Sequence, residues 1–195
     1  MLAALRDALG RFATGVTVVT TCGADGRCEG LTANSFSAVS LDPPLVLWSL
    51  RKNDGSLATF TGAPHFAVNV LAADQHQISS HFARSRPDKF AGITCGDGLG
   101  GCPVIAGALA TFECTVETQI EGGDHVIFIG RVQRAGYRDG EPLIFAVDPA
   151  TTPSWIVIDP TTGEITGTPP ADASQNSNTG IPGEYRVTIT ATDPD

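Results

Sequence analysis

The sequence predicts a mainly β protein, built as an antiparallel Greek-key barrel with short helices. Over residues 110–120 apolar and polar side chains alternate, which is typical of a long strand with one face in water. Most other apolar runs are short and end at turns rich in Gly, Asp or Pro, and no strand–helix–strand rhythm is present. Many strands without that rhythm favour a closed or nearly closed barrel. With 195 residues and 42% hydrophobic content, the chain can bury a substantial core.

The first elements are expected to be a helix and a β-hairpin. Apolar residues recur at helical spacing from Leu2 to Phe12, which predicts an amphipathic helix that lies on a larger surface. Residues 15–21 are rich in β-branched side chains and predict a strand that ends at a turn over 23–26. The chain then returns from Leu31 as the partner of that strand.

Residues 30–56 form the most informative stretch of the chain. Residues 31–40 carry small and hydroxyl side chains, interrupted by Phe36, so their backbone groups stay within reach of a flat ligand. The Pro43-Pro44 pair predicts a turn, and the apolar run 45–50 predicts a short buried strand after it. This part of the chain is therefore a candidate ligand wall.

The loop after that strand is rich in hydrogen-bond donors. Arg51 and Lys52 lie just before Asp54 and Ser56, either of which can cap a short helix near residues 57–61. Two cations beside the free N–H groups of a helix start form an anion site, so we expect a phosphate clasp here. The alternative is a solvated basic turn that follows a strand.

The middle of the chain is expected to contain a further strand, a helix and a loop. The run 66–71 predicts the strand, and Asp74 with Gln77 forms a capping pair for a helix that extends to Ala83. The glycine-rich run 96–101 is similar to a dinucleotide-binding fingerprint. A Cys-Pro pair follows it in place of a helix, so we expect a loop.

A basic connector and a hairpin histidine are further candidates for a site. The connector 82–90 carries Arg84, Arg86 and Lys89, which can meet an anion, although charged loops are often only solvated. A strand over 125–133 is expected to run back along 110–120, with a last strand beginning at 143–145. His125 is the first residue after the turn, where the sheet holds a side chain that stays accessible; the alternative is an ordinary surface histidine.

Composition limits the classes of function. The formal charge of −9 argues against a nucleic-acid or acidic-membrane partner, and no segment has the composition of a signal peptide or a membrane span. The five cysteines are an odd number without a CxxC pair, which favours reduced thiols and a cytoplasmic location over a disulfide scaffold or a zinc site. His76 and His81 are five residues apart, on different faces of a helix, so no metal site is predicted.

Five stretches in order carry a resemblance to a known family: FATGVTVVTT, GLTANSFSAVSLDPPLVLWSLRKNDGS, FAVNVLAADQ, FARSRPDKF and GDHVIFIGRV. Together they cover about residues 3–146, and this part of the chain resembles the flavin reductases, the small components of two-component flavin monooxygenases. The resemblance implies a split barrel that binds FMN or FAD, usually a homodimer with flavin sites near the subunit interface. It also implies oxidation of NADH or NADPH and delivery of reduced flavin to a partner monooxygenase.

The resemblance also implies roles for individual residues. Four would line the isoalloxazine and ribityl chain, namely Thr32, Ala33, Asn34 and Ser35. Four would hold the phosphate, namely Ser49, Arg51, Lys52 and Ser56. Phe82 and Arg84 match the connector that covers the flavin or the nucleotide, and His125 matches a catalytic residue near the nicotinamide. Hydride passes directly between stacked rings in this chemistry, so the protein supplies position and charge rather than a nucleophile.

After Phe145 the chain departs from the family, which ordinarily continues with an aromatic final strand. We therefore divide it into a barrel at 1–146 and a β appendage at 147–195. From Pro153 the appendage resembles half of an Ig-like, cadherin-like repeat of bacterial surface proteins, a partial sandwich. Residues 147–195 as a whole hold seven acids against Arg186 alone. Two alternatives to a reductase stay open: a flavin-binding or surface-adhesion β module without reductase activity, and a flavoprotein that keeps its flavin bound.

Overall fold

A computed structural model of the chain describes residues 2–86, 88–145, 156–158 and 165–167. Its barrel is mainly β, as predicted. The elements are α1 (Leu2–Leu9), β1 (Thr14–Gly15), β2 (Thr17–Cys22), β3 (Cys28–Ala33), β4 (Ser37–Leu41), β5 (Pro44–Arg51), α2 (Leu57–Gly62), β6 (His65–Val70), η1 (Ala73–Gln75), α3 (His76–Phe82), β7 (Cys95–Asp97), η2 (Leu99–Gly101), β8 (Pro103–Ile105), β9 (Ala110–Gly122), β10 (His125–Tyr137), β11 (Ile144–Phe145), β12 (Ile156–Ile158) and β13 (Ile165–Gly167).

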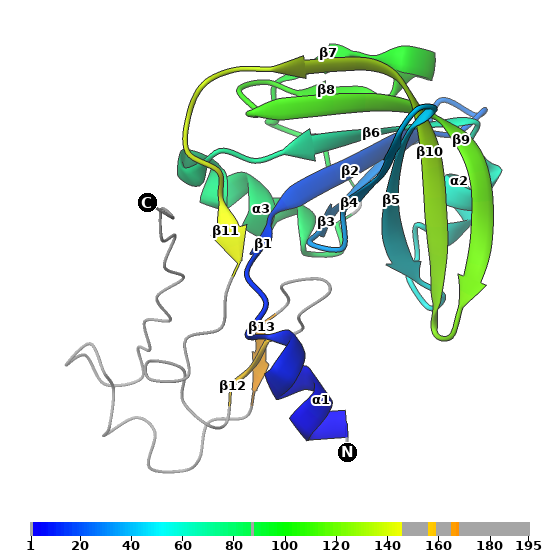
Figure 1. Cartoon of the computed structure of the whole chain (residues 1–195). Helices are drawn as coiled ribbons and strands as arrows, with labels where there is room; N and C mark the ends of the chain where they lie inside the picture. The colour runs from blue at the N-terminus through cyan, green and yellow to red at the C-terminus, as the bar shows by residue number, and fades with distance from the viewer. Residues whose placement is uncertain (1, 87, 146–155, 159–164, 168–195) are drawn as a thin grey trace.

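Seven antiparallel strands form one curled sheet, the split barrel, in the order β3-β2-β6-β9-β10-β5-β4 (Figure 1). The long hairpin β9–β10 is its largest unit, and β10 also pairs with β5. Beyond β3, Ser35 ties the two ends of the sheet together, because its Oγ accepts a hydrogen bond of 3.0 Å from the backbone N–H of Ser49 on β5. Along the rest of β3, no strand of the described residues pairs with its outer edge, so the barrel is split there.

Aromatic side chains fill the interior of the barrel. Trp48 on β5 stacks on Phe128 of β10 with ring centroids 4.7 Å apart, and Phe60 of α2 and Phe66 of β6 approach the Trp48 ring edge-on. All four are buried together with Val19, Leu31, Val68 and Cys114 from the other strands. The predicted alternation along β9 and β10 places two of these side chains, Cys114 and Phe128, inward, because every second residue of a strand points to the same face.

A second apolar cluster lies between the sheet and α3. It includes Val18, Leu71, Phe82 and Leu143, and Phe145 of the two-residue strand β11 completes it. β11 pairs with β1, Thr14 opposite Phe145. The expected last strand is therefore present, although it is short.

Three local predictions differ from the structure. Helix α1 ends at Leu9 and does not lie flat on a larger surface, since Leu5 and Leu9 are more than half exposed. Gln75, not Gln77, caps the turn before α3, because its Oε1 accepts a 3.0 Å hydrogen bond from the N–H of Ala72. The glycine-rich segment 95–101 contains the short strand β7 and a 3₁₀ turn rather than only a loop.

The expectation of five reduced thiols is wrong. Cys22 and Cys28 form a disulfide, while Cys95, Cys102 and Cys114 are free. The two bonded cysteines face each other across the hairpin β2–β3, with Cα atoms 4.0 Å apart, because the predicted turn brings positions six residues apart into register. A pairing between cysteines six residues apart, set by a turn, leaves no CxxC pattern in the sequence.

The described part of the appendage is a small antiparallel pair, β12 with β13, in which Ile156 is opposite Gly167. The remainder of the predicted partial sandwich lies outside the described residues. Across the described residues, none of the helices has the length and apolar character needed to cross a membrane. The same part of the chain holds no group of His, Cys, Asp and Glu side chains suited to a metal ion.

Candidate flavin site

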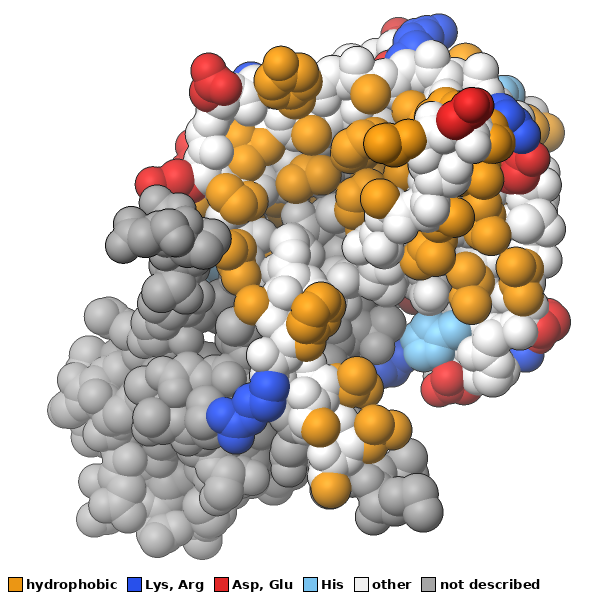
Figure 2. Space-filling model, in the orientation of Figure 1, with side chains coloured by type: hydrophobic (Ala, Val, Ile, Leu, Met, Phe, Trp, Pro, Cys, Tyr) orange, Lys and Arg blue, Asp and Glu red, His pale blue; other side chains and the backbone are white. Residues whose placement is uncertain are grey.

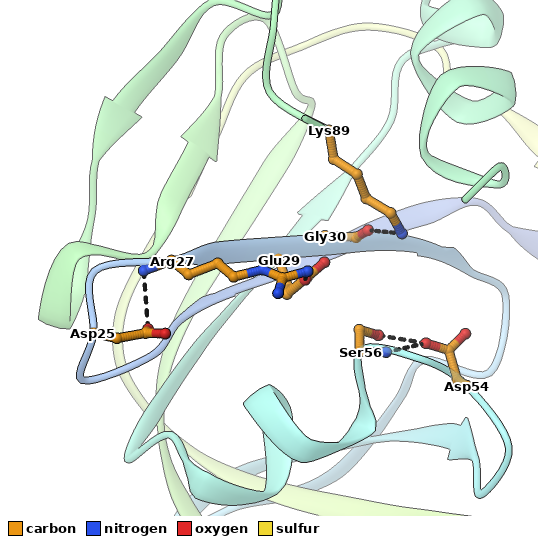
Figure 3. A network of polar contacts seen from close by, with 7 residues as sticks. All are labelled: Asp25, Arg27, Glu29, Gly30, Asp54, Ser56 and Lys89. Carbon is orange, nitrogen blue, oxygen red and sulfur yellow. Dashed lines mark hydrogen bonds and ion pairs between the residues drawn. The ribbon is translucent and has the colours of Figure 1, made fainter. Parts of the chain in front are cut away.

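A cavity of about 220 Å³ opens at the split of the barrel, between the free edge of β3 and the end of β5. Of the residues implied by the family resemblance, it brings together Thr32, Ala33, Ser49, Arg51, Ser56, Phe82 and Arg84. Segments far apart in sequence thus meet at one place. In Figure 3, β3 runs between the connector that carries Lys89 and the loop that carries Asp54 and Ser56.

The wall of the cavity is the predicted run of small residues on β3. Gly30 lets the connector pack against this strand, since a Cβ atom there would lie 2.8 Å from the Phe82 ring. Lys89 donates a 2.8 Å hydrogen bond from Nζ to the edge carbonyl of Gly30 (Figure 3). Thr32 is fixed on the same side by a 2.7 Å bond from its hydroxyl to the carbonyl of Ser79 on α3. The wall is therefore held in place by α3 and the connector, and Phe82 and Lys89 line the cavity together with Thr32 and Ala33.

The clasp is ordered by Asp54. Its Oδ1 accepts hydrogen bonds from the backbone N–H of Ser56 at 2.8 Å and from the Ser56 hydroxyl at 2.5 Å (Figure 3). Ser56 is the first residue before α2, and its own side chain makes no cap hydrogen bond to the helix. Asp54 thus shapes the loop as an Asx turn, and Ser56 is buried at the cavity wall.

Basic side chains outnumber acidic ones around this cavity. The cations are Arg27, Arg51, Arg84, Arg86 and Lys89, and the carboxylates are Glu29 and Asp54. The whole chain has a formal charge of −9, so this excess is local. A concave site lined by one sign of charge concentrates ligands of the opposite sign, here phosphate groups.

Two predicted wall residues lie beside the cavity, not in it. Asn34 and Ser35 line a second, more open hollow of about 490 Å³, together with Phe12, Phe36 and Phe145. Because Thr32 and Ala33 precede them directly, the wall runs from the first cavity into the second. Ser35 also has the structural role of tying β3 to β5.

Lys52 is the predicted clasp residue that the structure places elsewhere. It lines neither cavity, and its ammonium group forms an ion pair with Glu121 of β9. Its backbone N–H donates a 2.9 Å hydrogen bond to the carbonyl of Asp124, which joins the clasp loop to the β9–β10 turn.

His125 lies beside the clasp loop without lining either cavity. It is opposite Arg51 in the β5–β10 ladder. Its Nδ1 is 2.8 Å from Asp124 Oδ1, and its Nε2 is buried without a hydrogen-bond partner among the described residues. The hydrogen bond from the His125 ring, with further electrostatic interactions with that ring and with Arg51, lowers the pKa of Asp124. The carboxylate therefore stays ionised and orients the imidazole.

Sequence reasoning missed Arg27 and Glu29 at the outer end of the cavity. They lie directly after the predicted turn over 23–26, where the hairpin β2–β3 returns. One signal was available: Glu29 is the only charged residue in the β3 segment CEGLTA, whose other residues are small or apolar.

Comparison with known families matches residues 9–150 to the family described as "Flavin reductase like domain". Residues 110–195 match the family described as "Putative Ig domain", so the two matches overlap at the end of the barrel. The second match agrees with the predicted Ig-like character of the C-terminal part.

Individual relatives agree with the first match. The chain is 48% identical over 141 residues to an FMN reductase (NADH) of Agrobacterium fabrum, covering 72% of this chain and 80% of that protein. It is also 48% identical over 129 residues, which are 66% of this chain, to the reductase component of a flavin-dependent trigonelline monooxygenase of Acinetobacter baylyi. Among these curated relatives the coverage varies, and the chain spans only 42% of the length of two of them.

Solved structures share the fold. An NADH:FAD oxidoreductase of Streptomyces globisporus aligns with a TM-score of 0.71 at 43% identity, covering 74% of this chain and 88% of that one. The same oxidoreductase has been solved in complex with NAD and FAD fragments.

Proposed function

Because the chain belongs to the flavin reductase like domain family, we propose that its barrel is an NAD(P)H:flavin oxidoreductase that reduces FMN or FAD. The observation that carries this proposal is the cavity at the split of the barrel, where the β3 wall, the Asp54–Ser56 loop and five basic side chains meet. Relatives named as NADH-dependent reductases of FMN and of FAD support it.

The residues present fit a flavin. Basic side chains suit its phosphate, the unpaired edge of β3 offers backbone groups, and the wall of small residues allows a flat ring to approach. We assign Ser49, Arg51, Ser56 and Arg84 to the phosphate region, and Phe82 to the cover. Thr32, Ala33, Asn34 and Ser35 form the wall along the ring and ribityl chain. Lys52 keeps an indirect role through its contact with the Asp124 loop.

Bound flavin supplies the chemistry by accepting a hydride at N5 from the reduced nicotinamide. The chain's own residues hold the two rings in position, which lowers the entropic part of the barrier. We assign His125 to the nicotinamide side: Asp124 fixes the Nδ1 end of its ring, and the Nε2 atom is left for a ligand.

The proposal extends to assembly and location. A homodimer is supported by exposed apolar side chains: Leu41 is 93% exposed and Phe12 75%. Figure 2 shows hydrophobic side chains gathered over the barrel on one face. We also propose a cytoplasmic location, where reduced nicotinamide nucleotides are available. We further propose delivery of reduced flavin to a monooxygenase, because two relatives are named as the reductase component or subunit of a flavin-dependent monooxygenase.

We treat residues 1–146 as the catalytic unit and 147–195 as a non-catalytic Ig-like segment. The match of 110–195 to an Ig-domain family favours a second candidate function, a surface-adhesion module whose barrel binds flavin without turnover.

The deciding experiment is NADH and NADPH oxidation at 340 nm by the purified chain, with and without FMN or FAD, alongside its mass by light scattering. The reductase proposal expects turnover that rises with added flavin, from a dimer. A folded protein that binds flavin but shows no turnover would support the adhesion-module candidate. Flavin retained through gel filtration would indicate a prosthetic group instead of an exchanging substrate.

A further inference from the structure

The cavity continues past the clasp to the outer end of β3. Arg27 and Glu29 line it there, and in Figure 3 they follow one another along the strand and its turn, away from Gly30. A strand rises by about 3.3 Å per residue, so Glu29 is about 10 Å along β3 from Thr32 of the flavin wall. A mononucleotide that ends in its phosphate at the clasp leaves this end of the cavity unused.

Glu29 is an unusual residue for a phosphate site. It is only 6% exposed, and its one ion pair within the described chain joins Oε1 to Arg27 Nη2 at 2.8 Å. An ionised carboxylate accepts hydrogen bonds and donates none, so it repels phosphate and suits hydroxyl or amino donors. The hydroxyls of a ribose and the amino group of an adenine are such donors.

Arg27 complements the carboxylate from the solvent side. Its side chain is 68% exposed, and its backbone N–H donates a 3.0 Å hydrogen bond to Asp25 Oδ1, which fixes the turn (Figure 3). A guanidinium in this position can bind a phosphate or stack on a base. Arg86 and Lys89 reach the same cavity from the connector and supply further positive charge.

Resting on the proposed function, we propose that Arg27 and Glu29 form a subsite for the adenosine half of a flavin dinucleotide, and that this chain prefers FAD to FMN. The shared clasp holds the phosphate nearest the flavin. Beyond it, Glu29 accepts hydrogen bonds from the adenosine ribose or base, and Arg27 contacts the second phosphate or the base.

The test compares dissociation constants of riboflavin, FMN and FAD, measured by flavin fluorescence on the full-length wild type, Glu29→Met and Arg27→Gln. Met has the length of Glu without its acceptors, and Arg27→Gln removes the same pair from the exposed side if the buried change impairs folding. The matched controls are Glu117→Met and Arg131→Gln, since these residues form an Arg–Glu pair on β9 and β10 that does not line the cavity.

We expect wild type to bind FAD at least about tenfold more tightly than FMN, a difference of about 1.4 kcal/mol. Each Arg27 or Glu29 variant should raise the dissociation constant of FAD about tenfold and change those of FMN and riboflavin by less than about twofold. The control variants should change none of the three dissociation constants. Equal wild-type affinity for FMN and FAD would overturn the proposal. An equal loss of FMN affinity in the Arg27 or Glu29 variants would also overturn it, because it would place Glu29 on the ribityl chain. These outcomes are separate from the reductase proposal, which fails only if no flavin supports NADH or NADPH oxidation.

Discussion

At the scale of single residues, His125 is the side chain that we propose for the nicotinamide side of the site. It has one ring nitrogen fixed by Asp124 and the other buried without a described partner. Its side chain as a whole is 18% exposed. A histidine that is held at one end only is suited to contact a ligand at the other.

We predict that His125→Ala lowers kcat/KM for the nicotinamide substrate by about tenfold, because the loss of one hydrogen bond of this kind is worth about 1 kcal/mol or slightly more. Flavin affinity should change little. Steady-state kinetics with varied NADH, and separate flavin titrations, check this split. His76→Ala, at the exposed start of α3, is the control. An equal loss of kcat/KM in both variants would contradict the assignment of His125 to the nicotinamide side.

The cysteines give a second prediction at this scale. Burial raises the pKa values of the Cys102 and Cys114 thiols, that of Cys114 to about 12, and so keeps both in the unreactive protonated form. A thiol reagent at pH 8 should modify Cys95 first, because it is only partly buried. The denatured chain should react at three thiols without reductant and at five after reduction. Five reactive thiols without reductant would contradict the Cys22–Cys28 bond.

At the scale of elements, the contact between β3 and the connector holds the cavity together. Gly30 is the point of closest approach, where a Cβ would meet Phe82 at 2.8 Å and Phe90 at 3.1 Å. Phe82 is fully buried against the second cluster and has little room to move.

Gly30→Ala should therefore lower the free energy of unfolding by about 1–3 kcal/mol, the usual cost of overpacking. It should also weaken flavin binding several-fold, because the displaced connector carries Arg84 and Lys89. Denaturant unfolding and flavin titration measure the two effects. Gly96→Ala is the matched control, a strand glycine whose added Cβ has no neighbour within 4 Å; a similar loss there would show that contact with Phe82 is not the cause.

The elements that sequence alone predicted best are those with a regular period. The alternation along β9 and β10 identified both strands and their inward faces. A sheet that covers a core needs apolar side chains on its inner face and polar ones on its outer face, so apolar and polar residues alternate along each strand. Local capping was harder: Asp74–Gln77 and Gln75–Ala72 both satisfy the same spacing rule, and only the tertiary position of the turn decides between them. The disulfide and the Arg27–Glu29 pair depend on strand register, which short sequence patterns do not specify.

At the scale of the whole molecule, charge is unevenly distributed. The formal charge is −9, and the predicted Ig-like segment holds most of it, yet five cations surround one cavity. Long-range repulsion of an anionic flavin by the chain is screened beyond about 10 Å at ordinary salt, so the local excess of positive charge controls binding.

The salt dependence of flavin binding should therefore distinguish the contribution of the phosphate from that of the ring. Between about 0.01 M and about 0.5 M NaCl the Debye length shortens several-fold, and the partly exposed cations around the cavity lose much of their attraction for a phosphate dianion. We predict that FMN and FAD bind several-fold more weakly at the higher concentration, whereas riboflavin, which has no phosphate, changes by less than about twofold. Potassium glutamate in place of NaCl controls for specific chloride binding. An equal salt effect on riboflavin would mean that the basic residues act on the folded state of the barrel and not on the phosphate.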